Sequence, residues 1–496
     1  MVNPIKSLIS QTAAYGLSSI IGRFLNYLLV PLYTRVFFPD EFGVFTELLA
    51  YVGFLLIILT YGMETGFFRF SENSKYNRNT VYSTVLSSVF YTAFSFSIII
   101  FLFNSEIADL LGYTRNSEYI LLLGLTISID AFSAIPFASL RLKNKVRIFV
   151  TIKLINISLN IAFNLFFLIV LPKYFPGNNF FYQNFYNDSD VGYVFISYFL
   201  TSLITLLLLL PEIFTALKNY KFDFKVLKII LAYSIPLLFA GLAGMTSESL
   251  DKILLRYLIS VPDNIIHAND YIMSQIGIYG ANVKIAVLMT LFIQAFRYAA
   301  EPFFFSYAKN DNAKELYAKV MKYFIIFSLA VFLGITLLID FVKYIIDDKY
   351  HAGINVIPIL LFGKLFFGVI FNLSIWYKLT NKTNYAIILA STGAIITVIL
   401  NIILVPKFGY IGSAWAAFFA YLSMMVLSYF LGKKYYPIKY DFKNLAIYLI
   451  IALSFYFINL LVRNLTDYYL VLNFILLFSF LVIIIKKEKI NLNFFK

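Results

Sequence analysis

Residues 203–210 read LITLLLLL and residues 57–63 read IILTYGM, and both runs are apolar on every side rather than in alternation. The chain around them has 496 residues, of which 61% are apolar and only 13% are charged, with a mean hydropathy of +0.81. Soluble domains average roughly 45–50% apolar and about 25% charged residues. Because water cannot solvate this excess of apolar surface, the sequence predicts a protein that lies in a lipid bilayer.

A helix that crosses the hydrocarbon core needs ~20 mostly apolar residues. Such runs predict an all-α membrane protein with about fourteen spanning helices and little outside them. The predicted spans are 11–34, 42–68, 81–103, 117–138, 148–171, 191–214, 229–256, 276–300, 316–340, 354–377, 384–405, 409–431, 444–463 and 467–485. We expect the first span to be retained, because the segment before it holds a single lysine and no small-residue cleavage site follows.

The chain has no cysteine and two histidines, His267 and His351, both in predicted loops. Disulfides, thiolate metal sites and iron–sulfur clusters need residues that are missing here. We therefore expect no metal site, no cofactor and no redox chemistry, and coupling to a proton or sodium gradient stays open.

The net charge of +14 follows the predicted topology. With Met1 on the cytoplasmic side, 26 lysines and arginines lie in the inside segments and eight in the outside segments. Basic loops mark the cytoplasmic side of a membrane protein. The sequence thus predicts that both termini are cytoplasmic, and that the basic excess serves orientation among membrane lipids rather than nucleic-acid binding.

Two parts of the chain resemble each other. RLKNKVRIF at 141–149 aligns with KLTNKTNYA at 378–386, which sets Asn144 over Asn381 at a spacing of 237. In that register Asn164 falls on Asn401, and VLPK at 170–173 falls on LVPK at 404–407 at a spacing of 234. Chance similarity between two hydrophobic hairpins is the alternative.

A true repeat predicts two six-helix lobes, one of helices 1–6 (residues 1–220) and one of helices 7–12 (221–432), with two added helices in 433–496. Because each lobe has an even number of spans, the pseudo-two-fold axis runs along the membrane normal. Such lobes around a central cavity are the plan of an alternating-access transporter, with its substrate near mid-membrane.

Charged residues inside the predicted spans are the candidate site. A charge at the bilayer centre costs ~2.5–3.5 kcal/mol on insertion scales, so it needs a wet cavity or a partner. The candidate lining of a cationic cavity is Arg23, Lys284, Lys364, Arg297 and Lys153. The candidate ion-coupling or helix-pairing acids are Asp130, Glu248, Asp251, Glu64 and Glu301. Deep cations favour an anionic substrate with an apolar tail.

Purely structural roles for these charges stay open as well. Residues near a helix end, such as Lys153, Glu64 and Arg297, can extend to the interface. Further charged residues can pair between or along helices, as Arg297 can with Glu301 at i, i+4.

Five segments carry a resemblance to a known family. They are GRFLNYLLVPLYTRVFFPDEFGVF at 22–45, YGMETGFFRF at 61–70, YSIPLLFAGLAGMTSESLDKILLRYLIS at 233–260, IGIYGANVKI at 276–285 and FGYIGSAWAAFFAY at 408–421. They resemble the polysaccharide (Wzx-type) flippases of the multidrug/oligosaccharidyl-lipid/polysaccharide (MOP) exporter superfamily, over essentially the whole chain.

This resemblance implies a MATE-like exporter of fourteen helices in the bacterial inner membrane. Its substrate would be undecaprenyl-diphosphate-linked oligosaccharide, moved to the periplasmic leaflet for O-antigen, lipopolysaccharide, capsule or exopolysaccharide synthesis. The resemblance also places Arg23 at a cationic position of the first helix, and it leaves open a polysaccharide polymerase or a chain-length regulator as a partner.

Two more functions compete with the flippase. An ion-coupled drug or metabolite antiporter of the same superfamily would share the fold, and the sign of the cavity charge separates the two. A membrane-embedded polymerase or glycosyltransferase would need catalytic acids in a sizeable loop, yet the longest predicted outside loops, 172–190 and 257–275, have nineteen residues each. We therefore expect no catalytic residues and no enzyme.

Overall fold

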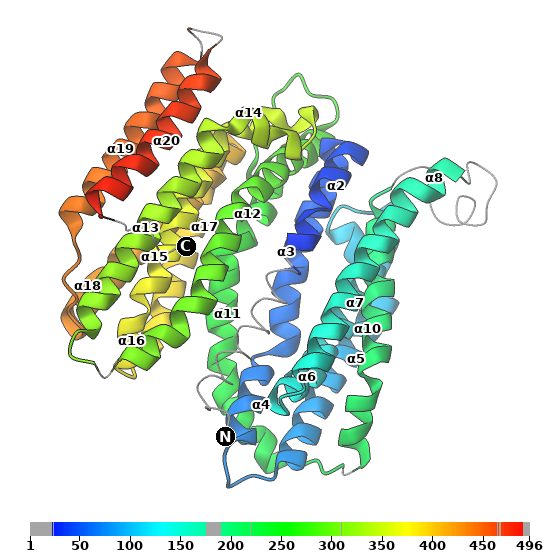
Figure 1. The fold of residues 1–496 in the computed structure, drawn as a ribbon. Coiled ribbons are helices and arrows are strands. Elements are labelled where there is room, and N and C mark those ends of the chain that lie inside the picture. Colours follow the sequence, from blue (N-terminus) through cyan, green and yellow to red (C-terminus); the bar gives the residue numbers. More distant parts are fainter. Residues whose placement is uncertain are drawn as a thin grey trace. The chain divides into compact units, whose positions relative to one another are not determined.

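The computed structural model describes residues 22, 24–174, 190–218, 220–308, 310–463, 465 and 468–489. Over these residues every regular element is helical (Figure 1). The chain forms two compact units, each described here by itself. The first unit comprises residues 1–256 and 265–277, and the second comprises 257–264 and 278–496.

The first unit contains nine complete helical elements, nearly all of a tenth and the start of α12 among its described residues. They are α2 (Val30–Val36), α3 (Pro39–Thr60), α4 (Met63–Ser71), α5 (Arg78–Leu110), α6 (Ser117–Leu142), α7 (Val146–Leu165), the π-helix η1 (Phe166–Val170), α8 (Leu171–Tyr174), α10 (Gly192–Lys218) and α11 (Phe224–Leu258), which ends just past the unit's boundary. Helix α6 is central, because α3, α4, α5, α7 and α10 all pack on it.

The second unit continues along α12 (Ala268–Tyr307) from Ile278. Its other elements are α13 (Ala313–Leu337), α14 (Ile339–Val342), η2 (Lys343–Ile345), η3 (Asp348–Val356), α15 (Ile357–Leu373), α16 (Ile375–Leu379), α17 (Asn384–Phe408), α18 (Tyr410–Tyr435), α19 (Phe442–Val462) and α20 (Tyr469–Lys487). Helix α18 packs on α15 and α17, whereas α13 packs on α15, α19 and α20.

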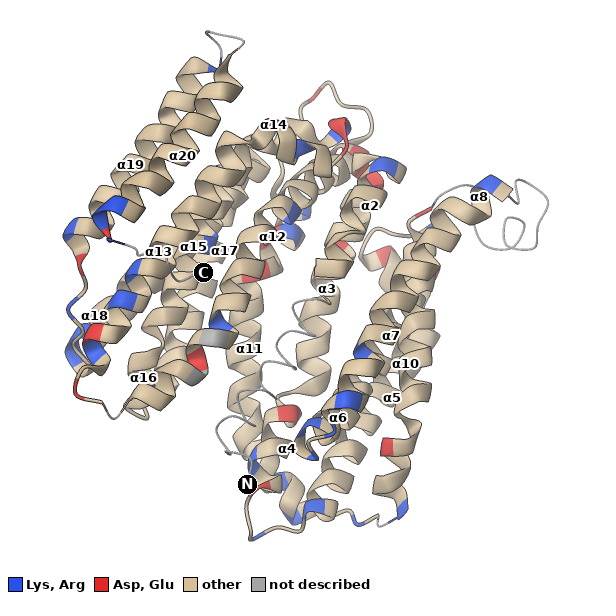
Figure 2. Cartoon of the chain, in the orientation of Figure 1, with Lys and Arg blue, Asp and Glu red and all other residues tan. Residues whose placement is uncertain are grey.

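Thirteen helices of the described chain are long and apolar enough to cross a membrane. They coincide with the second to the fourteenth predicted spans, which confirms the all-helical membrane class. Half of the first predicted span, 11–34, lies outside the described residues, and α2 covers its end. Figure 2 shows long uncharged helix bodies with most charges toward the helix ends, as hydrocarbon requires.

The second predicted span differs from the structure in one respect, because it is broken into α3 and α4. Tyr61 and Gly62 both have positive φ angles, 31° and 71°, which stop α3 and restart the chain as α4. Glycine adopts this left-handed region at little cost. A Cβ at Gly62 would also lie 2.8 Å from the backbone oxygen of Ser234, so α11 packs closely against the break.

The repeated Asn residues have the same backbone conformation. Asn144 and Asn381 have φ angles of 54° and 56°. The next residue in each case, Lys145 or Lys382, donates its N–H to the carbonyl five residues back, at 2.9 and 2.8 Å. This is the left-handed helix ending that favours Gly or Asn. The motifs aligned by sequence thus form the same turn in both units.

The lobe boundaries stay a prediction. The two units are defined by which residues pack together, whereas the two lobes are defined by the sequence repeat. Helix α11, which the repeat assigns to the second lobe, packs within the first unit. The two added helices, α19 and α20, pack on each other and on α13 in the second unit. Asn473 of α20 donates to the Leu337 carbonyl at the end of α13, at 2.8 Å.

Candidate functional site

A charged pocket in the second unit is formed where α12, α15 and α16 meet. Its charged side chains are Arg297 and Glu301 on α12 and Lys378 on α16. Ser374 separates α15 from α16 and donates its hydroxyl to the Phe371 carbonyl at 2.6 Å. Lys378 of α16 reaches Glu301 of α12, with its Nζ 2.6 Å from Oε1.

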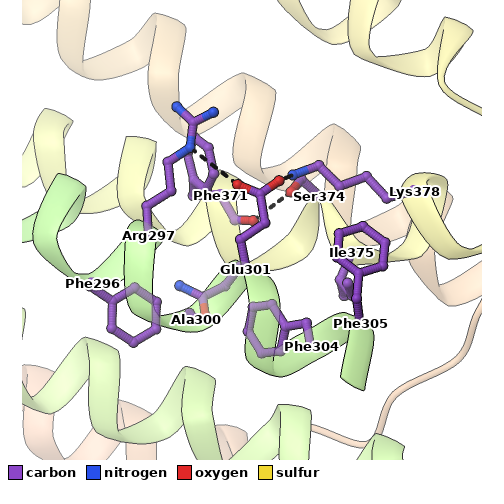
Figure 3. Close-up of a pocket in the computed structure, with 11 residues that line it drawn as sticks. Phe296, Arg297, Ala300, Glu301, Phe304, Phe305, Phe371, Ser374, Ile375 and Lys378 are labelled. Carbon is purple, nitrogen blue, oxygen red and sulfur yellow. Dashed lines mark hydrogen bonds and ion pairs between the residues drawn. The ribbon is translucent and has the colours of Figure 1, made fainter. Parts of the chain in front are cut away.

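Glu301 lies between two cations in this pocket (Figure 3). Its Oε1 accepts a hydrogen bond from Lys378 Nζ at 2.6 Å, and its Oε2 lies 3.6 Å from Arg297 Nε. The ring centroid of Phe371 lies 4.1 Å from Arg297 Cζ and 5.4 Å from Lys378 Nζ, within range of cation–π attraction. We call Arg297, Glu301, Phe371 and Lys378 the Glu301 cluster. It carries two positive charges and one negative charge.

The Glu301 cluster is open to the surroundings. The Arg297 side chain is 48% exposed and that of Glu301 37%. Exposed ion pairs contribute only about 0–1 kcal/mol to stability, so these charges are not explained by stability alone. Asn372 also lines the pocket, and its Oδ1 is buried without a hydrogen-bond partner among the described residues. The pocket therefore brings two cations together at an open site.

The first unit contains a counterpart of this cluster. Glu64 of α4 forms an ion pair with Arg141 at the end of α6. Both residues precede their counterparts, Glu301 and Lys378, by 237 positions, the spacing of the sequence repeat. We call Glu64 and Arg141 the Glu64 cluster.

The similarity extends around the acid. At the same spacing Tyr61 aligns with Tyr298, Phe67 with Phe304 and Phe68 with Phe305, whereas Thr60 aligns with Arg297. The Thr60 hydroxyl donates to the Leu56 carbonyl of its own helix at 2.7 Å. The Glu64 cluster thus has no cation at the position that corresponds to Arg297.

Two more predicted residues lie close to the Glu64 cluster. Lys153 of α7 lies 4.1 Å from the ring centroid of Phe137 and is within electrostatic range of Asp130, Glu64 and Arg141. With Lys153 and Asp130 included, the first unit has two cations and two acids here. Its charges are balanced, in contrast to the Glu301 cluster.

The remaining predicted residues lie apart from these clusters. Lys364 of α15 is half-buried with its Nζ 5.5 Å from the ring centroid of Tyr421, and Lys284 of α12 is also half-buried. On α11, Asp251 is buried and pairs with Lys252 at 2.8 Å, while Glu248 is exposed. Arg23 lies outside the described residues, so its predicted place in the cavity is not described.

Sequence reasoning missed Lys378 and Arg141, which it placed among the basic loops. Each lies at the C-terminal end of a helix and reaches back to an acid 77 positions earlier. The repeat spacing of 237 could have found both, because it aligns the two acids and the two bases together.

The described residues contain no group of three or more His, Cys, Asp or Glu side chains that could hold a metal ion. The site chemistry of the described chain is therefore that of ion pairs, aromatic rings and amide groups.

Comparison with known proteins shows that this chain shares its fold with solved membrane transporters. A family model described as "Polysaccharide biosynthesis protein" matches residues 32–174, a little over a quarter of the chain. A solved structure of the lipid II flippase MurJ in an inward closed conformation has a TM-score of 0.71 at 17% identity, and the match covers 97% of this chain and 100% of that one. The chain has the fold of the MOP exporters.

Two MATE structures have the same fold. An inward-facing multidrug resistance MATE transporter of the MOP superfamily has a TM-score of 0.65 at 14% identity, covering 83% of this chain and 93% of that one. A MATE protein in complex with MaD3S has a TM-score of 0.60 at 16% identity, covering 86% and 95%. Comparison with curated proteins gives no match. The fold that the resemblance in the sequence implied is thereby confirmed.

Proposed function

We propose that this protein is a flippase that moves undecaprenyl-diphosphate-linked oligosaccharide from the cytoplasmic to the periplasmic leaflet by alternating access. It would act in synthesis of a surface polysaccharide such as O-antigen, lipopolysaccharide, capsule or exopolysaccharide. A polysaccharide polymerase or a chain-length regulator is a candidate partner. The protein would lie in the bacterial inner membrane with both termini in the cytoplasm.

The Glu301 cluster is the observation that carries this proposal. A diphosphate needs compensating charge when it leaves water, and Arg297 and Lys378 offer two charge-assisted donors in one pocket. The family match to polysaccharide biosynthesis and the fold shared with a lipid II flippase support the same substrate class.

The proposed transport changes no covalent bond of the substrate. Ligand binding would shift the populations of inward- and outward-open states, and it can do so only through different affinities for the two states. The compared MurJ structure is a flippase, and the compared MATE structures are transporters. This supports the expectation that the chain is not an enzyme. A proton or sodium gradient could supply the driving force, and the acids Asp130, Glu248, Asp251, Glu64 and Glu301 are its candidate sites.

Complementation of a flippase-deficient strain tests the proposal. Surface polysaccharide should return with the unaltered protein and should be lost in Lys284→Ala, Lys364→Ala and Arg297→Ala at normal protein levels. Retained export in all three variants would remove these cations from the substrate path.

A drug antiporter is the second candidate, because two of the compared folds are MATE transporters. Efflux of a cationic dye from proteoliposomes, unaffected by Arg297→Ala, would favour this function over the flippase.

A further inference from the structure

The two repeat-related clusters differ by one cation, and that difference suggests distinct roles. In both units a glutamate ties one helix to the end of another, Glu64 to Arg141 and Glu301 to Lys378. The Glu301 cluster also holds Arg297, where the first unit has Thr60. The Glu64 pair is neutral, whereas the Glu301 cluster keeps one positive charge in excess.

Glu301 occupies the positions that an anionic ligand would need. One oxygen accepts from Lys378, and the other faces Arg297. Figure 3 shows the carboxylate between the two cations. An anion that bound both cations would therefore compete directly with the Glu301 carboxylate.

We propose that Glu301 is an internal competitor for the anionic substrate, and that binding displaces it. This inference rests on the proposed function, because it takes the Glu301 cluster as the anion site. A diphosphate carries more charge than a carboxylate and has more acceptor oxygens, so it forms stronger charge-assisted hydrogen bonds with the same two cations. The excess positive charge favours the exchange.

Displacement of Glu301 has a mechanical consequence. The Lys378–Glu301 bond links α16 to α12 across 77 residues of sequence. When the anion takes Lys378, that link is released, so α12 and α16 can separate. Near the Glu64–Arg141 pair, Asp130 balances Lys153, so the described residues there carry no excess positive charge to attract an anion. The equivalent link between α4 and α6 therefore stays closed. The repeat thus supplies one ligand-sensitive link and one constitutive link.

The affinity test uses inorganic pyrophosphate and the full-length purified protein. Glu301→Gln keeps the side-chain shape but removes the competing charge, so it should bind pyrophosphate about fivefold more tightly, since an exposed ion pair is worth up to about 1 kcal/mol. Arg297→Thr copies the residue of the first unit and should weaken binding about fivefold. Glu64→Gln and the exposed control Arg115→Thr should leave affinity unchanged.

The movement test leaves Glu301 intact. The chain has no cysteine, so no native thiol would react with a spin label. A label at Phe305→Cys reports on α12, and a label at Thr383→Cys reports on the loop that follows α16. Both positions are exposed. Saturating pyrophosphate should lengthen the distance between the labels, and Arg297→Thr should abolish that change.

The outcomes separate this inference from the proposed function. Unchanged or weaker binding by Glu301→Gln, with weaker binding by Arg297→Thr, would overturn the competitor role and keep the anion site. Unchanged binding by Arg297→Thr would remove the anion site itself. If Glu301→Gln does not fold, the label distance in the otherwise unaltered protein decides, and a distance that pyrophosphate does not change overturns the inference.

Discussion

At the scale of single residues, the buried carboxylate of Glu47 shows how this chain tolerates charge in an apolar interior. The side chain is 0% exposed, and its Oε2 lies 2.7 Å from Arg256 Nη1. The Tyr113 hydroxyl donates to the same oxygen. Burial first, and then the Glu47 charge, raises the pKa of Tyr113 well above its ordinary value, so Tyr113 stays protonated and remains a donor. Arg256 and Tyr113 together compensate the buried charge.

Removal of Arg256 should therefore be costly. Arg256→Met leaves the Glu47 charge buried without its cation, and breaking a buried pair in this way costs about 3–5 kcal/mol. Thermal unfolding in detergent should show a clear drop in melting temperature. The double variant Glu47→Gln/Arg256→Met should recover part of that drop, because no bare charge remains. Equal losses in the single and double variants would contradict this role of Arg256.

At the scale of elements, α3 and the first part of α12 approach at two glycines. A Cβ at Gly43 would lie 1.9 Å from the Met273 backbone oxygen, and one at Gly277 would lie 1.8 Å from the Pro39 backbone oxygen. Both pairs, Gly43 with Gly277 and Pro39 with Met273, are 234 positions apart, so the contact has the symmetry of the repeat. Two backbones this close leave no room for a side chain.

Alanine at either glycine should push α3 and α12 apart. Overpacking of this kind costs about 1–3 kcal/mol, so Gly43→Ala and Gly277→Ala should lower the melting temperature. Gly244 of α11 is the control, because a Cβ there meets no other atom within 4 Å. Gly244→Ala should be neutral or stabilising, by up to about 1 kcal/mol, as alanine favours helix. A loss in Gly244→Ala equal to that in the two contact variants would argue against close backbone contact as the cause.

Helices α19 and α20 are held at one end by Asp340 of α14. Its carboxylate lies 2.6 Å from Arg463 and 2.9 Å from Lys343, and it accepts the Tyr469 hydroxyl at 3.0 Å. Burial raises the pKa of Asp340, but the bonds from Lys343 and Tyr469 and the charge of Arg463 outweigh burial, and the net pKa lies below its ordinary value. Asp340 therefore stabilises the fold in its charged form.

The sign of the pH dependence follows from that lowered pKa. The contribution of Asp340 is fully present above its ordinary pKa and is lost as the pH falls through the lowered value. Asp340→Asn should reduce thermal stability at pH 7 and should flatten the loss of stability on acidification. Asp311→Asn, in the exposed α12–α13 connection, is the charge-matched control. The same acid profile in Asp340→Asn and the unaltered protein would rule out this role.

At the scale of the whole molecule, the sidedness of the loops is the property on which the proposed transport depends most directly. The 26 inside and eight outside basic residues assign each loop to a side through the positive-inside rule. An added or missing span would reverse every later loop. The thirteen spans of the described residues match the second to the fourteenth predicted spans, so no span is added or missing from residue 42 onward.

Reporter fusions test the assignment. Fusions after Lys145 and Lys434 should report the cytoplasm, and a fusion after Asp188 should report the periplasm. Paired reporters, one active on each side, provide the control. A periplasmic signal from the fusion at either lysine would contradict the fourteen-span topology.

The sequence by itself determined the membrane class, the helical spans from 42 onward and the alignment of the repeat motifs. These properties depend on solvation and on local backbone preference. A continuous apolar run shows the first in the sequence, and an Asn at a helix end shows the second. The i, i+4 pair of Arg297 and Glu301 was also within reach of sequence, because one helix turn sets its geometry.

Only the tertiary structure decided which distant charges meet. Glu47 pairs with Arg256 across 209 residues, and Glu301 pairs with Lys378 across 77. In lipid, helices associate through packing and polar contacts that depend on which faces meet, and a hydrophobic stripe does not specify that choice. For this reason Lys378 seemed a loop lysine in the sequence, and the fold made it part of the candidate site.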